Sequence, residues 1–318
     1  MAKNSNLHAA KVAKNDEFYT MLTDIEKEMS HYKDFFRGKV VYCNCDDARE
    51  SNFFKYFSKN FEFLGLKKLI TTGYKAEGKG VVLVYEGDKN GNRKVEDEEI
   101  TIKELEGSGD FRSEECIEFL KEADVVVTNP PFSLFREYVK QLMDYGKKFI
   151  IVGPMNAVTY KEIFPYIKNN QLWLGQNARG GSRKGNSLSF VGYDGTEKQV
   201  SSWWFANVEN DRHNTPLDLY KKYSNEYPHY ENYNAIEVSK SCNIPLDYNG
   251  AMGVPISFLM FHCPEQFEII GIAQGSEEMA GECYLGIVPT IKYDGGKARA
   301  YVDGKPVYCR IFIRKRTA

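Results

Sequence analysis

Residues 124–132 read Asp-Val-Val-Val-Thr-Asn-Pro-Pro-Phe, an apolar run that stops at an amide side chain and two prolines. A short apolar run bounded by turn residues is typical of a strand buried on both faces of a parallel sheet. Residues 134–145 follow with apolar side chains at helical spacing, and residues 149–152 form a second apolar run. The stretch therefore predicts a strand–helix–strand unit of an α/β sheet.

The same alternation runs through the first half of the chain. Strands are predicted over residues 39–43 and 68–72, and helices over residues 15–32, 51–63 and 112–122. Residues 81–85 and 95–102 flank an Asn90-Gly91 turn, which indicates a hairpin. We expect residues 1–155 to form a doubly wound, mainly parallel Rossmann-like sheet, with its ligand cleft outside the carboxyl ends of the strands. Asn129 follows one such end.

After residue 155 the pattern changes to short apolar segments separated by Gly-containing turns. Segments 188–193 and 200–208 flank Asp194-Gly195, segments 287–293 and 298–302 flank residues 294–296, and Tyr301 and residues 307–313 flank Asp303-Gly304. These are hairpin signals. We expect residues 156–318 to hold the remainder of the sheet and a β-rich region. The pair Trp203-Trp204 lies in a strand pattern, where core packing is the favoured interpretation over base stacking.

Composition is that of a globular protein: 318 residues, 42% apolar and 27% charged, with a net charge of −2. The densest apolar stretch, residues 254–261, is too short to span a membrane, and residues 1–15 lack the apolar run of a secretory signal. Seven irregularly spaced cysteines match no zinc pattern, so no metal is expected. Reduced thiols in a cytoplasmic protein are the favoured interpretation.

The tetrapeptide 129–132 has the residue types that methylation of an amino group requires. An exocyclic NH2 group is a poor nucleophile, because its lone pair is delocalised into the ring. The side-chain oxygen of Asn129 and the main-chain carbonyl of Pro130 can accept its two hydrogens, and prolines hold both acceptors in place. Phe132 can stack on the base. The structural alternative is a strand-to-helix turn that Pro130 and Pro131 merely stiffen.

The chain resembles the EcoRI-type adenine-specific DNA methyltransferases over nearly its whole length. The stretches that carry this resemblance are residues 14–20, 41–47, 51–57, 129–132, 253–258, 264–270 and 305–313. The resemblance implies site-specific transfer of a methyl group from S-adenosylmethionine to adenine N6 in DNA, in a restriction–modification or orphan context. The adenine must be flipped out of the duplex. It also implies catalytic roles for Asn129, Pro130, Pro131 and Phe132.

The resemblance further implies a cofactor site formed by three segments. Its expected residues are Phe18, Tyr19, Thr20, Asn44, Cys45, Asp46, Asp47, Asp110 and Phe111. Two features depart from adenine methyltransferases in general. No G-x-G loop follows the first predicted strand, and residues 71–74 offer no acid for the ribose. From the residues alone, Asp46 and Asp47 could equally cap the following helix.

For DNA contact, the sequence indicates Arg179, Arg183 and Lys184. They lie within residues 151–200, which carry six basic and three acidic side chains. Such residues can contact the phosphate backbone or hydrogen-bond to base edges. The alternative is a solvated loop with no partner. The expected partner is double-stranded DNA, with the protein acting as a monomer and away from membranes.

Two other functions fit parts of the sequence. A methyltransferase with this tetrapeptide could instead act on RNA or on a protein glutamine, because its acceptors suit any planar NH2 group. A non-catalytic nucleic-acid-binding relative is the second alternative, which the missing G-x-G loop favours and the intact tetrapeptide opposes. The long second half, suited to recognition of a duplex, favours DNA methylation.

Overall fold

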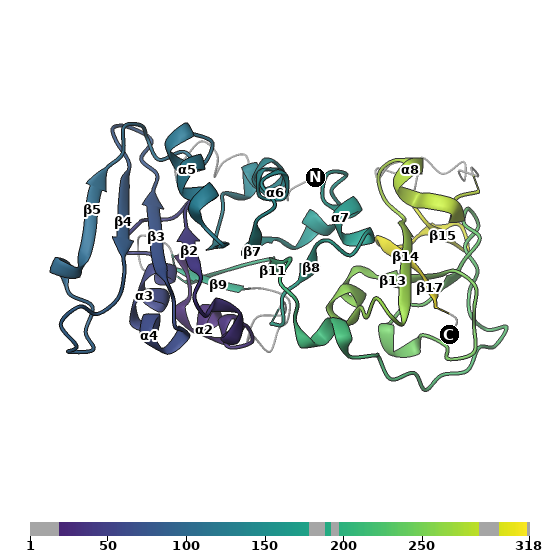
Figure 1. The fold of residues 1–318 in the computed structure, drawn as a ribbon. Coiled ribbons are helices and arrows are strands. Elements are labelled where there is room, and N and C mark those ends of the chain that lie inside the picture. Colours follow the sequence, from purple (N-terminus) through teal and green to yellow (C-terminus); the bar gives the residue numbers. More distant parts are fainter. Residues whose placement is uncertain (1–18, 178–187, 192–196, 286–298, 317–318) are drawn as a thin grey trace. The chain divides into compact units, whose positions relative to one another are not determined.

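The computed structural model describes residues 19–177, 188–191, 197–285 and 299–316. It divides into two compact units (Figure 1). Unit 1 comprises residues 1–155 and 175–208, and unit 2 comprises residues 156–174 and 209–318. The chain therefore leaves unit 1 once, returns to it, and leaves it again.

Four parallel strands form the centre of the unit 1 sheet. They are β3 (Lys68–Gly73), β2 (Val40–Cys43), β6 (Val125–Thr128) and β7 (Lys148–Pro154), adjacent in this order. Beyond β3 lie the antiparallel strands β4 (Val81–Tyr85) and β5 (Ile100–Glu104), and β11 (Ser202–Ala206) pairs antiparallel with β7. The predicted α/β class, the mainly parallel sheet and the hairpin around Asn90-Gly91 are confirmed.

Helices cover both faces of this sheet, which makes it doubly wound. Alternate residues of a strand face opposite sides. Val41 and Val125 belong to the same core cluster as side chains of α2 (Leu22–Met29), α3 (Asn52–Lys59) and α4 (Phe61–Leu64). On the other face, Tyr42 lies 6.3 Å from Phe119 of α5 (Glu114–Glu122), measured between ring centroids. Helix α6 (Phe135–Asp144) connects β6 to β7.

Trp203 and Trp204 are fully buried, as predicted for core residues. Because they are successive residues of β11, they point to opposite faces of the sheet. Trp204 lies 6.2 Å from Phe53 in an edge-to-face arrangement. Neither ring is available as a stacking surface for a base.

The predicted helix over residues 15–32 is wrong at its start, because Tyr19 and Thr20 form strand β1 and the helix α2 begins at Leu22. Strand β1 pairs antiparallel with β9 (Leu188–Val191), and β9 pairs with β10 (Glu197–Val200). The apolar spacing of residues 18–32 gave no sign of a partner so distant in the chain. The hairpin across Asp194-Gly195 is confirmed, but its second strand is β10, while β11 joins the main sheet.

Unit 2 is rich in short strands. Its main sheet has the order β12 (Ile236–Glu237), β13 (Met252–Pro255), β17 (Arg310–Lys315) and β14 (Phe267–Ile272). The turn at Asp303-Gly304 joins β15 (Tyr301–Val302) to β16 (Lys305–Pro306), as a hairpin was predicted there. However, the predicted partner segment 307–313 instead supplies β17, which pairs with β13 and β14. The hairpin proposed around residues 294–296 lies outside the described residues.

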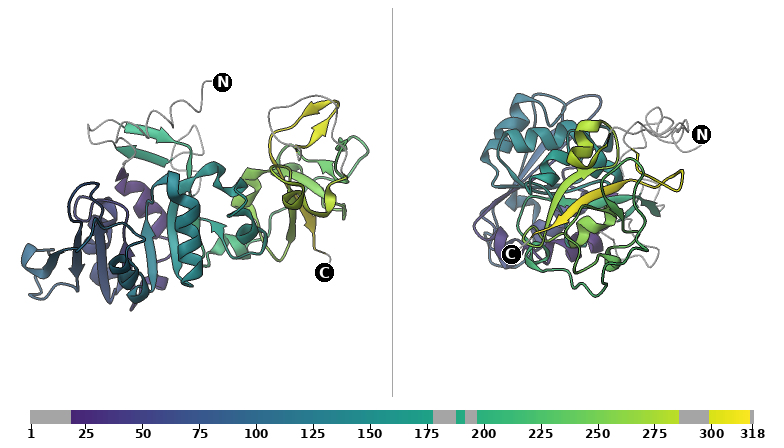
Figure 2. Two further views of the ribbon diagram at one scale, coloured as in Figure 1. Left: turned by 90° about the horizontal axis from the view of Figure 1, so that it is seen from above. Right: turned by 90° about the vertical axis from the view of Figure 1, so that its right-hand side faces the viewer.

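Short elements complete both units. Unit 2 contains α7 (Phe164–Lys168), β8 (Trp173–Leu174) and α8 (Glu277–Ala280). The short 3-10 helices are η1 (Asp34–Phe36), η2 (Asp97–Glu99), η3 (Phe132–Leu134), η4 (Met155–Thr159), η5 (Asp211–Asn214), η6 (Ser241–Asn243), η7 (Ile256–Phe261) and η8 (Gly281–Cys283). Two further views show the ribbon from other sides (Figure 2). In the described ranges, no helix has the length and apolar character needed to cross a bilayer.

Candidate active site

The tetrapeptide lies beside the turn that follows β2. Strands β2 and β6 are parallel neighbours, with Val41 opposite Val125 and Tyr42 opposite Val126. Their carboxyl ends therefore meet at one edge of the sheet, where ligands bind in open α/β folds. A hydrogen bond from the Thr128 hydroxyl to the main-chain carbonyl of Asn44 ties the two ends together.

Within the tetrapeptide, Asn129 is half-buried and its side-chain oxygen is shielded from solvent. Pro130 is buried, and Pro131 has an extended conformation with φ −61° and ψ 125°. Phe132 begins η3 and packs against the core cluster of unit 1. The segment thus joins a buried strand to a helix, and the prolines restrict its main chain at the sheet edge.

Asn44 and Cys45 form the turn where a G-x-G loop would be expected. Asn44 is only 4% exposed, and its Oδ1 accepts a hydrogen bond of 2.5 Å from the Tyr138 hydroxyl. Cys45 has φ 68°, a left-handed conformation that is uncommon for residues other than glycine. A glycine-type turn is therefore made here without glycine. Burial raises the pKa of the Cys45 thiol well above its usual range, so the thiol is neutral.

Asp46 and Asp47 both bind groups of the chain itself. Asp46 Oδ2 accepts a hydrogen bond of 2.8 Å from the hydroxyl of Ser51, the residue that caps α3. Asp47 Oδ1 accepts from the main-chain N–H groups of Arg49 and Glu50, at 2.9 and 2.7 Å. Neither aspartate caps α3, because Ser51 is its N-cap: Asp46 holds the Ser51 hydroxyl, and Asp47 closes the turn before the helix. A cofactor contact by either carboxylate stays a prediction.

Asp110 is brought to the same sheet edge by close packing of glycines. Gly109 has φ 82°, and a Cβ there would lie 2.4 Å from the carbonyl oxygen of Gly73 at the end of β3. Arg112 donates to Asp110 from its main chain and its Nε, each at 2.9 Å, and from Nη2 at 2.6 Å. These bonds lower the pKa of the Asp110 carboxyl. Asp110 is therefore a fixed, ionised acceptor.

Phe111 and Tyr138 extend this cluster behind the turn. The Phe111 ring is buried, and it meets the Tyr138 ring edge-to-face with 5.0 Å between centroids. Gln141 of the same helix donates to the Phe111 carbonyl at 3.1 Å. Tyr138 thus contacts both Asn44 and Phe111, two residues that are 67 positions apart in the chain. Sequence reasoning missed Tyr138, because an aromatic residue on the apolar side of a helix reads as core.

The N-terminal segment reaches the same region through α3. Asn52 of α3 donates from its side chain to the Thr20 carbonyl at 2.8 Å. Thr20 is 1% exposed, and its hydroxyl oxygen has no hydrogen-bond partner within the described ranges. A buried hydroxyl without a partner is costly, and a polar ligand would offset that cost. Of the other residues predicted for this segment, Tyr19 pairs with β9 through its main chain, while Phe18 lies outside the described residues.

The predicted DNA-contact residues Arg179, Arg183 and Lys184 also lie outside the described residues. The structure therefore describes most of the predicted catalytic and cofactor positions, and none of these three.

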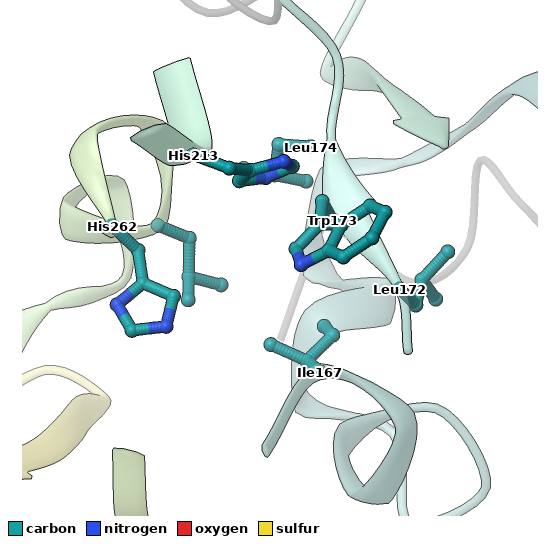
Figure 3. Close-up of a pocket in the computed structure, with 7 residues that line it drawn as sticks. Ile167, Leu172, Trp173, Leu174, His213 and His262 are labelled. Carbon is teal, nitrogen blue, oxygen red and sulfur yellow. The ribbon is translucent and has the colours of Figure 1, made fainter. Parts of the chain in front are cut away.

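Unit 2 contains a pocket that sequence reasoning did not assign. It is lined by Ile167, Leu172, Trp173, Leu174, His213, Leu259 and His262 (Figure 3). The ring centroids of His213 and Trp173 are 4.3 Å apart, and His262 Nε2 lies 3.2 Å from Asn170 Oδ1. The Nδ1 atoms of both histidines are buried and have no hydrogen-bond partner among the residues that the structure describes. Burial lowers the pKa of each histidine to about 4, so both rings are neutral.

Comparison with known proteins gives a consistent result. The model of the family described as "Adenine-specific methyltransferase EcoRI" matches residues 6–316. The chain is 46% identical to Type II methyltransferase M.EcoRI of Escherichia coli, over 87% of this chain and 92% of that protein. It is 36% identical to M.MgeORF184P of Mycoplasma genitalium, over 98% and 99%, and 37% identical to M.MpnI of Mycoplasma pneumoniae, over 96% and 97%.

Proposed function

Because this chain belongs to the EcoRI family of adenine-specific methyltransferases, we propose that it methylates adenine N6 at a specific site in duplex DNA. Relatives that match nearly its full length bear the name Type II methyltransferase. The observation that carries the proposal is the location of Asn129 at the carboxyl end of β6, directly beside the turn after β2.

Asn129 and Pro130 supply the acceptors for the reacting amino group. The Asn129 side-chain oxygen and the Pro130 carbonyl each accept one hydrogen of the NH2 group, which favours a tetrahedral nitrogen with a free lone pair. The restricted main chain at Pro130 and Pro131 keeps these acceptors oriented before reaction, so little reorganisation is needed. Phe132 stacks on the flipped adenine, since N6 is inaccessible within the duplex.

S-adenosylmethionine is the cofactor we assign, and it supplies an electrophilic methyl group when bound. The orphaned buried hydroxyl of Thr20 and the fixed charge of Asp110 support this assignment. Arg112 occupies three of the roughly four lone-pair positions of the Asp110 carboxylate, which leaves one for the adenine amino group of the cofactor. Phe111 packs on the adenine ring of the cofactor. Asn44 and Cys45 contact its methionine end.

The remaining cofactor contacts follow the family pattern. Phe18 and Tyr19 close over the methionine end together with Thr20. Asp46 and Asp47 face its cationic amino group from the turn after β2. This last contact is compatible with their hydrogen bonds to the chain itself, since each carboxylate oxygen accepts more than one hydrogen bond.

We assign catalysis to unit 1 and recognition of the DNA target to the β-rich unit 2. Arg179, Arg183 and Lys184 are proposed as phosphate contacts. Replacing all three with alanine should weaken DNA binding and flatten its salt dependence, because phosphate contacts release counterions. An unchanged salt slope would contradict this part of the proposal. We further propose that the protein acts as a monomer.

The function is tested by transfer of a radiolabelled methyl group from S-adenosylmethionine to three acceptors: duplex DNA, RNA and protein. We expect label only in duplex DNA, as N6-methyladenine within one sequence. Label in RNA or protein, or cofactor binding without any transfer, would contradict the proposal. Sequencing of modified bases in DNA from cells that express the chain identifies the site.

A further inference from the structure

Three tyrosine rings stack on one another in unit 2. Tyr223 is the central ring. Its centroid lies 4.6 Å from that of Tyr248, with 27° between the planes, and 5.8 Å from that of Tyr227, with 20° between the planes. All three side chains are half-buried, so the stack is part of the surface. Neighbouring Tyr220 is 77% exposed.

Two chain segments hold these rings in place. Residues 221–227 and 243–248 are joined by three hydrogen bonds: Leu246 N to Lys221 O at 2.9 Å, Tyr223 N to Asp247 Oδ1 at 2.7 Å, and Tyr227 OH to Asn243 O at 2.7 Å. Gly250 gives room for the Tyr248 ring, since a Cβ there would lie 2.5 Å from the Tyr248 hydroxyl. The rings are therefore ordered before any ligand arrives, which lowers the entropic cost of binding.

The stack also carries unused hydrogen-bond donors. In the part of the chain that the structure describes, the hydroxyls of Tyr223 and Tyr248 donate to no protein group, whereas Tyr227 donates to Asn243. Lys221 and Lys222 are exposed, and neither forms an ion pair with a described residue. We define the tyrosine platform as Tyr223, Tyr227, Tyr248, Lys221 and Lys222.

We propose that the tyrosine platform binds the phosphate backbone of the duplex DNA substrate. The inference rests on the proposed function, which makes duplex DNA a partner. Lysine ammonium groups and tyrosine hydroxyls donate hydrogen bonds to phosphate oxygens. Such contacts position a protein on DNA without distinguishing one base sequence from another. Three exposed acids, Asp218, Glu226 and Asp247, lie in or beside the two segments and outnumber the two lysines. Directed donors rather than net charge therefore favour the phosphates.

The chemistry of the platform predicts two separable effects. Each lysine that neutralises a phosphate adds about 0.9 to the slope of log affinity against log salt. A neutral tyrosine hydroxyl adds affinity without changing that slope, by about twofold to twelvefold for each hydrogen bond. Both effects should be equal on DNA with and without the target sequence.

The test measures binding of the full chain to a labelled duplex over a series of salt concentrations. For Lys221→Ala/Lys222→Ala, we expect a slope shallower by about 2. For Tyr223→Phe/Tyr248→Phe, which keeps both rings, we expect roughly tenfold weaker binding at an unchanged slope. Lys103→Ala, at an exposed lysine of strand β5 in unit 1, is the control and should bind as the original chain does.

Original slope and affinity in both double variants would overturn the platform. So would a loss confined to the target sequence, because that would indicate base contacts. A different result would contradict the proposed function, namely that the original chain transfers no methyl group to duplex DNA. A chain that methylates DNA while both double variants bind normally would refute the platform alone.

Discussion

The hydroxyl of Tyr138 donates a hydrogen bond of 2.5 Å to Asn44 Oδ1, which joins helix α6 to the turn after strand β2. Helix α6 follows the tetrapeptide, and the turn holds the residues assigned to the methionine end of the cofactor. This buried pair therefore links the helix after the tetrapeptide to the turn that we assign to the cofactor. Burial raises the pKa of Tyr138 well above its usual range, so its hydroxyl remains a donor at physiological pH.

Tyr138→Phe should weaken cofactor binding. The substitution leaves the buried Asn44 oxygen without this donor, which typically costs about 1–3 kcal/mol. Part of that cost should appear as a lower free energy of unfolding, and part as a weaker affinity for S-adenosylmethionine by calorimetry. Tyr145→Phe is the control, because Tyr145 is an exposed residue at the end of the same helix. Unchanged cofactor affinity in Tyr138→Phe would show that this link does not affect the cofactor site.

Asp110→Ala should reduce affinity for the cofactor more than affinity for DNA. Its carboxylate is held by Arg112 and kept ionised, and its proposed partner is the adenine amino group of the cofactor. Loss of a hydrogen bond to a charged group typically costs about 1.5–3 kcal/mol, roughly tenfold to a hundredfold in affinity. Glu137→Gln is the matched control, since Glu137 is the other, exposed partner of Arg112. Equal cofactor affinity in the two variants would refute the assignment.

Breaking the buried ion pair between Glu237 and Arg310 should destabilise unit 2. The Arg310 Nη2 to Glu237 Oε1 distance is 2.7 Å, and the side chains are 12% and 9% exposed. Glu237→Gln or Arg310→Met should lower the free energy of unfolding by about 3–5 kcal/mol, since each leaves a buried charge unpaired. The double variant should lose less than the sum of the two.

The exposed pair between Arg314 and Glu282 is the control for this prediction. Arg314→Met should cost under about 1 kcal/mol in denaturant unfolding. Similar losses for Arg310→Met and Arg314→Met would mean that burial of the first pair has no energetic effect.

Unit 2 should lose stability as the pH falls from about 6.5 to about 4. In the folded protein the pKa values of His213 and His262 are lowered to about 4, whereas an unfolded histidine has a pKa near 6.5. Between these values the unfolded state binds more protons. The free energy of unfolding should therefore fall by up to about 1.4 kcal/mol per pH unit for each histidine, and this loss should level off below pH 4.

The check compares urea unfolding of the original chain with that of His213→Gln/His262→Gln over this pH range. The double variant should have a shallower pH dependence, while His229→Gln, at an exposed histidine, should not differ from the original chain. Parallel curves for the original chain and the double variant would show that the two buried histidines do not titrate as described.

The sequence was most informative where local signals and long-range packing agree. Residues 124–132 predicted β6 and the turn after it, because a continuous apolar run and two prolines leave few other conformations. The predicted start of the first helix was wrong, because Tyr19 and Thr20 pair with β9, which lies about 170 positions later. Similarly, β17 could not be assigned from its turn, because its partners β13 and β14 are set by the packing of unit 2.

The candidate site residues show the same difference between local signals and long-range contacts. Asn129 was proposed from its own motif, whereas Tyr138 and Thr128 were not singled out, because their hydrogen bonds to Asn44 cross between separate elements. Cys45 takes the left-handed conformation that a glycine usually supplies, so the turn exists although the G-x-G pattern does not. Periodicity and motif spacing carry no signal for such contacts.

The central claim is that Asn129 activates the target amino group, and single-turnover methyl transfer to duplex DNA by Asn129→Ala tests it most directly. We expect the rate to fall about a hundredfold to a thousandfold, because one preorganised acceptor is lost in the transition state. Affinity for S-adenosylmethionine, measured in parallel, should stay nearly unchanged. A rate close to that of the original chain would contradict the account and would leave residues 129–132 as only a stiff turn.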